Sequence, residues 1–60
     1  SKEQMEHMIK NLTNHKGTVI HESAMVWRAY VLDYSADGFS AEEATFELLK
    51  KFEAGEASQK

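Results

Sequence analysis

Apolar residues near the start of the chain recur at helical spacing. They are Met5, Met8, Ile9 and Leu12. Positions i, i+3, i+4 and i+7 fall on one face of a helix, and the charged residues between them fall on the other faces. The pattern predicts an amphipathic helix over 2–15. We expect it to end near Gly17, because glycine accepts the left-handed conformation in which many helices stop.

A second helix is predicted over 41–54. Ser40 followed three residues later by Glu43 is the capping-box pattern that marks a helix start, and Phe39 precedes it as a hydrophobic staple. The residues expected to face inward are Ala41, Ala44, Thr45, Leu48 and Phe52. The polar end of the chain, 56–60, is expected to fray.

The middle segment, 18–36, admits two interpretations. As a helix it places one apolar stripe on a single face: Ile20, Ala24, Trp27, Val31 and Tyr34. As strands its aromatic and β-branched content is favourable, but neither face alternates cleanly and no Asn-Gly or Asp-Gly pair marks a hairpin turn. The helix is favoured, so the predicted fold is all-α, a small bundle of three helices (2–15, 18–36 and 41–54) in one domain, 1–60.

The strand interpretation brings a family resemblance with it. The stretches 27–33 (WRAYVLD) and 38–44 (GFSAEEA) resemble the strand-loop-helix of HicB-type antitoxins. The resemblance covers less than half of the chain, and its second stretch is shared with capped helix starts in general. It implies strands in the middle segment and an antitoxin-like, nucleic-acid-binding domain, and we assign no family on it.

A second apolar row on the favoured middle helix predicts self-association. The row consists of Met25, Ala29, Leu32 and Ala36. A chain of 60 residues without cysteine buries a small core, and oligomerisation is the usual way to supplement it. We therefore expect a homo-oligomer in which this row forms the subunit interface.

Polar and aromatic residues of the same segment form a candidate ligand site. Arg28 is the only arginine, and an arginine beside aromatic rings can hold a phosphate and stack on a base. The predicted ligand-binding residues are Arg28, His21, Trp27, Tyr30, Tyr34 and Lys16. The expected ligand is a small anionic, nucleotide-like molecule held in a pocket between subunits.

Charge and motif content argue against several function classes. The formal net charge is −3 and the seven basic residues are scattered, which disfavours binding to nucleic acid. The histidines, His7, His15 and His21, lack metal-ligand spacing, so no metal or other cofactor is expected. No cysteine nucleophile, glycine-rich phosphate loop or marked catalytic set occurs, and we expect no enzyme activity.

These exclusions leave binding as the expected activity. The first residues lack the apolar run of a signal peptide and no stretch could span a membrane, so we expect a cytoplasmic protein. We predict that it sequesters or inhibits its target, as compact inhibitors encoded by phages do. An alternative target is a host protein engaged through an exposed apolar helix face, with Met5, Met8 and Met25 as adaptable contacts.

Overall fold

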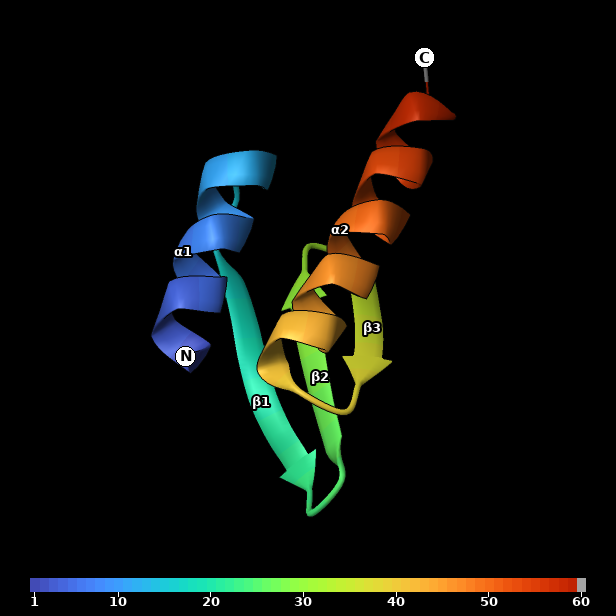
Figure 1. Ribbon diagram of the computed structural model, residues 1–60. Helices are drawn as coiled ribbons and strands as arrows, with labels where there is room; N and C mark the ends of the chain where they lie inside the picture. The colour runs from blue at the N-terminus through green and yellow to red at the C-terminus, as the bar shows by residue number, and fades with distance from the viewer. Residues whose placement is uncertain (60) are drawn as a thin grey trace.

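The protein is an α+β domain in which two helices cover one face of a three-stranded antiparallel sheet (Figure 1). The computed structural model describes residues 1–59. The elements are helix α1 (Lys2–Thr13), strands β1 (Gly17–Ser23), β2 (Val26–Val31) and β3 (Tyr34–Gly38), and helix α2 (Ala41–Ala57). The strands follow one another in the order β1-β2-β3.

The predicted all-α fold is wrong, and with it the helical bundle, because 18–36 forms strands. Alternate residues of this segment lie on the helix side of the sheet: Val19, Ala29, Val31 and Ala36 are all buried. Their neighbours along each strand face the other way, which is the two-residue period of a half-buried sheet. The outward face also carries apolar groups, among them Ile20 and Tyr30, and they mask the alternation in the sequence.

The core lies between the sheet and the two helices. Val19 pairs with Ala29, and Ala29 with Ala36, so small and β-branched side chains cross the sheet in one row. The helices cover this row with buried side chains of their own: Met5, Ile9, Ala41, Ala44, Thr45 and Leu48. The predicted inward face of the second helix is confirmed at four of these positions, Ala41, Ala44, Thr45 and Leu48.

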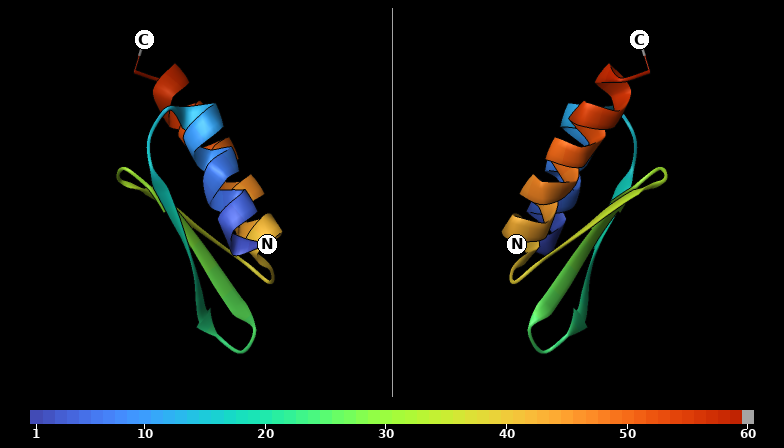
Figure 2. Two further views of the ribbon diagram at one scale, coloured as in Figure 1. Left: turned by 90° about the vertical axis from the view of Figure 1, so that its left-hand side faces the viewer. Right: turned by 90° about the vertical axis from the view of Figure 1, so that its right-hand side faces the viewer.

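The two helices run in the same direction and move apart toward their C-terminal ends (Figure 1). At the opposite end, the β1–β2 hairpin extends past the start of both helices (Figure 2). The helix layer therefore covers the sheet only in part, and the space between the helices widens toward Thr13 and Ala57.

The ends of the helices follow the sequence in part. The Ser40 hydroxyl accepts a hydrogen bond from the Glu43 amide at 3.0 Å, which confirms the predicted cap. The Glu43 carboxylate accepts from the Phe39 amide at 2.6 Å, but the Phe39 ring is 75% exposed and forms no buried staple. α1 ends earlier than predicted, at Thr13, and the next residue, Asn14, has a φ of 64° and supplies the left-handed cap expected of Gly17.

The β2–β3 turn holds a strained leucine. Leu32 has a φ of 52°, in the left-handed region that costs an L-residue other than glycine about 1–2 kcal/mol. Its side chain is 57% exposed, so little packing compensates for this cost. We expect Leu32→Gly to stabilise the protein by about 1 kcal/mol, read as a higher midpoint in urea unfolding. Asp33→Gly, one residue on, is the control and gives no gain, because Asp33 has no positive φ to relieve.

Candidate functional site

The sheet separates the residues predicted to bind a ligand. Arg28 and Tyr30 lie on its outer face, whereas Trp27 alternates with them and lies on the helix side. His21 pairs with Trp27 across the strands, and the two rings stack with centroids 4.5 Å apart. Tyr34 packs against the core at the other end of the sheet. The structure thus brings Arg28 close to Tyr30 and His21 close to Trp27. It does not gather the whole predicted set around one cavity.

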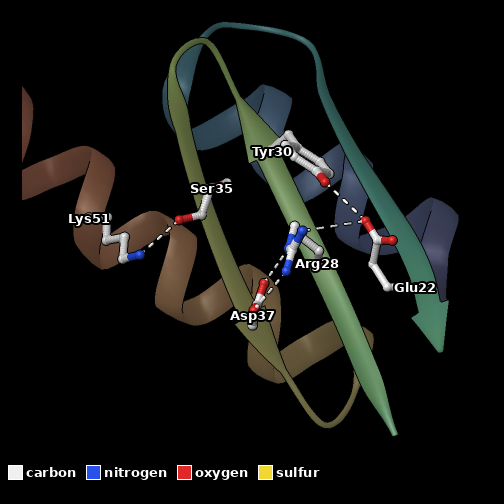
Figure 3. A network of polar contacts seen from close by, with 6 residues as sticks. All are labelled: Glu22, Arg28, Tyr30, Ser35, Asp37 and Lys51. Atoms are coloured by element: carbon white, nitrogen blue, oxygen red, sulfur yellow. Dashed lines mark hydrogen bonds and ion pairs between the residues drawn. The ribbon is translucent and has the colours of Figure 1, made fainter. Parts of the chain in front are cut away.

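Arg28 is held by carboxylates on the neighbouring strands (Figure 3). Its Nε and Nη2 donate to the two carboxylate oxygens of Asp37, at 2.5 and 3.1 Å, and Nη1 lies 3.8 Å from Glu22 Oε1. The Tyr30 hydroxyl donates to the same Glu22 oxygen at 3.0 Å. The hydrogen bond with Asp37 raises the pKa of Arg28 above its ordinary value. An anionic ligand would therefore have to displace two carboxylates to reach this guanidinium.

The Arg28–Asp37 pair makes stability depend on acid pH. The hydrogen bond from Arg28 lowers the pKa of Asp37 below its ordinary value of 3.8. A carboxyl with a lowered folded-state pKa stabilises the fold above its unfolded pKa, and this contribution is lost as pH falls through the folded value. We expect Asp37→Asn to lose less stability than the wild type between neutral pH and pH values below 3.8, as measured by thermal melts. Asp33→Asn, outside the network, is the matched control and should follow the wild type.

Two residues of the predicted subunit interface lie inside the subunit. Ala29 and Ala36 are buried against α2 and pair with each other across the sheet, so neither offers a surface to a partner. Met25 and Leu32 are exposed in the two turns between the strands. This separation follows from the strand period: residues that would share a helix face are divided between the core and the turns.

On each edge of the sheet, a charged side chain occupies one backbone group. The Glu6 carboxylate accepts from the Val19 amide at 2.8 Å on the β1 edge, and the Lys51 ammonium donates to the Ser35 carbonyl at 2.9 Å on the β3 edge. Figure 3 shows the contact of Lys51 with Ser35. Occupied edge groups oppose the addition of a further strand. Pairing with a foreign strand is therefore disfavoured at these points.

An apolar groove opens where the helices diverge. It has a volume of about 330 Å³ and is lined by Leu12 of α1 and by Leu49, Phe52, Glu53, Glu56 and Ala57 of α2. We call it the helix groove. The Leu12 side chain is 66% exposed, although periodicity predicted it to be in the core. The sequence signal for this site is weak. Leu12 is the last residue of the apolar stripe of α1, and a short chain has no further element to cover it.

Aromatic contacts hold Phe52, one of the residues that line the helix groove, in place. The Phe52 ring packs edge-to-face on Tyr34, with centroids 5.5 Å apart, and on His15 at 6.5 Å. The Tyr34 hydroxyl donates to Glu56 Oε2 at 3.1 Å. Burial raises the pKa of Tyr34, and the bond to the Glu56 carboxylate raises it further. Two lining residues of the groove, Phe52 and Glu56, are thus held in place before any partner binds.

The charged rim of the helix groove is acidic. Within residues 1–59, neither Glu53 nor Glu56 forms an ion pair. Lys50 on the same helix pairs instead with Glu47 at 2.8 Å. The last turn of α2 has no basic residue to offset the partial negative charge of its carbonyls. The groove therefore combines apolar walls with a negative potential.

The described residues contain no metal-ligand cluster and no helix that could cross a membrane. In residues 1–59, no group of three or more acidic, histidine or cysteine side chains is placed to hold a metal ion. Neither α1 nor α2 has the length and apolar character needed to cross a membrane. Comparison of the chain with models of known protein families, with curated proteins and with solved structures found no match.

Proposed function

We propose that the protein is a non-enzymatic binding module that inhibits or sequesters another protein by docking it in the helix groove. The observation that carries the proposal is the exposure of Leu12 beside a cavity walled by Leu49 and Phe52. Apolar side chains gathered around a preformed groove are typical of protein-docking surfaces. The proposal keeps the predicted cytoplasmic setting and the predicted mode of action, occupation of a target without turnover.

A protein target is favoured over a small anionic ligand for two reasons. The only arginine is already paired with Asp37 and Glu22 on the outer face of the sheet. The stacked rings of His21 and Trp27 lie on the other face, so the groups proposed to hold a phosphate and a base do not converge. Antiparallel sheets often leave one face exposed to solvent. The polar network around Arg28 is consistent with a solvent-exposed outer face.

Site-specific photo-crosslinking in the native cell tests the proposal. A photoreactive residue at Leu12 should give a discrete adduct with one partner protein, and Leu49→Gln in the same chain should remove that adduct. The matched control is the photoreactive residue at Thr18, which is exposed on the outer face of the sheet and should give no such adduct. Equal labelling from both positions, or an adduct only from Thr18, would reject the helix groove as the docking site.

A thermal-shift screen with nucleotides tests the competing ligand class. A ligand present at a hundred times its dissociation constant stabilises its protein by about 2.7 kcal/mol, which is easily seen in a small domain. We expect no shift with nucleotides. A clear shift that Arg28→Gln abolishes would favour the anionic-ligand hypothesis instead.

A further inference from the structure

From the charge around the helix groove we infer that its occupant is a basic amphipathic segment of the partner protein, with an apolar anchor flanked by lysine or arginine. The inference rests on the proposed function and names the chemistry of the partner. Glu53 and Glu56 are the charged residues that line the groove. A cationic side chain beside the anchor would lie close to both carboxylates, while the anchor itself packs between the apolar residues of the groove.

The helix axes add to this preference for cations. Both helices run in the same direction, so both end on the side where they diverge (Figure 1). A helix C-terminus carries about half a negative charge. Lys10 lies in the last turn of α1, but the last turn of α2 has no basic residue. The potential from α2 therefore adds to that of Glu53 and Glu56, and a lysine or arginine of the partner offsets it.

A second copy of the chain fits the helix groove less well. Two copies related by a two-fold axis would place the same surface on both sides of the contact. Glu53 and Glu56 would then face the same two carboxylates of the other copy, and like charges at close range oppose binding. The volume of about 330 Å³ is at the small end for binding pockets, which suits one or two anchoring side chains of a partner segment.

Two synthetic peptides provide the probe. Both are short amphipathic helices with leucine at the same positions, and they differ only in having lysine or glutamate at the remaining positions. Titration calorimetry should show that the lysine peptide binds at least about tenfold more tightly than the glutamate peptide at low salt. The difference should shrink as salt is added, because screening weakens interactions between exposed charges.

Charge reversal on α2 locates the effect. Glu53→Lys should lower the affinity for the lysine peptide by about fivefold and raise the affinity for the glutamate peptide, since it reverses one charge of the groove lining. The matched control is Glu47→Lys, the same substitution on the same helix at a residue that pairs with Lys50 outside the groove. The control should leave the ratio of the two affinities unchanged. Leu12→Gln should lower the affinity for both peptides, because Leu12 is an apolar lining residue of the groove.

The outcomes separate the inference from the proposed function. If both peptides bind equally tightly and Leu12→Gln weakens both, the groove is a docking site but the basic partner is wrong. If Glu47→Lys changes the ratio as much as Glu53→Lys, the preference reflects net charge and the inference fails. If sedimentation shows self-association that Leu12→Gln removes, the occupant is a second copy and the inference is again overturned. If neither peptide binds and a photoreactive Leu12 gives no adduct, the proposed function itself fails.

Discussion

Val31→Glu is expected to leave the protein unfolded at room temperature. Val31 is 1% exposed and lies in β2 between Gly17 of β1 and Tyr34 of β3. A carboxylate placed there is cut off from water and has no basic partner, which costs several kcal/mol. The whole stability of a domain this small is of the same order. Circular dichroism of the variant should show the loss of both helix and strand signals.

The adjacent substitution, Leu32→Glu, is the matched control. Leu32 lies in the β2–β3 turn with an exposed side chain, so the same charge stays in water and stability should change by less than about 0.5 kcal/mol. The contrast depends on the strand period, in which one residue separates the core from the surface. Two folded variants, or two unfolded ones, would show that the assigned ends and register of β2 are wrong.

Leu48→Ala is expected to cost about 2–5 kcal/mol. Leu48 is fully buried on the face of α2 that contacts the sheet, and the rigid strands below it cannot close the cavity that alanine would leave. Urea unfolding should show a much lower midpoint with the same slope, because the folded and unfolded states expose nearly the same surfaces as before.

Phe46→Ala is the control for this prediction. The substitution removes a larger side chain from the same helix, but Phe46 is half exposed and contributes less to the core. Its cost should therefore be well below that of Leu48→Ala. If Phe46→Ala destabilises the protein more, the face of α2 that packs on the sheet has been assigned wrongly.

The two helices could be predicted from the sequence because their signals are local. The second begins at Ala41 as predicted, since Ser40 forms the cap by itself with an amide three residues on. It continues to Ala57, beyond the predicted end at 54, because Gly55 lies against the Tyr34 ring and remains helical. The first helix ends at Thr13 instead of 15, because the next residue, Asn14, adopts the left-handed conformation that caps it.

The strands could not be predicted with the same rules. The β2–β3 turn uses Leu32 in a left-handed conformation that asparagine or glycine normally supplies, so the usual hairpin signal is missing. The β1–β2 pairing is irregular between His21 and Ser23, which disturbs the alternation at the other turn. The strand over 27–33 implied by the resemblance to HicB-type antitoxins agrees with β2, although the family comparison found no match.

The candidate site depends on long-range geometry that the sequence does not display. Arg28 meets Glu22 and Asp37 only because three strands align in one register, and a helical reading places these residues on different faces. Leu12 belongs to the apolar stripe of α1, but the divergence of the helices leaves it uncovered. In the two helices local periodicity identified the apolar face, and the packing of whole elements decided which residues of that face are buried.

The leucine methyl groups offer the most direct test of the helix groove as the docking surface. The chain has four leucines: Leu12, Leu32, Leu48 and Leu49. In a methyl NMR spectrum of the selectively labelled protein, the lysine peptide should shift Leu12 and Leu49, which line the groove. Leu48 in the core should stay unchanged. Leu32 should also stay unchanged, because it lines a different cavity beside the β2–β3 turn, which shares only Glu56 with the groove. Shifts at Leu32 with none at Leu12 or Leu49 would contradict the assignment of the docking surface.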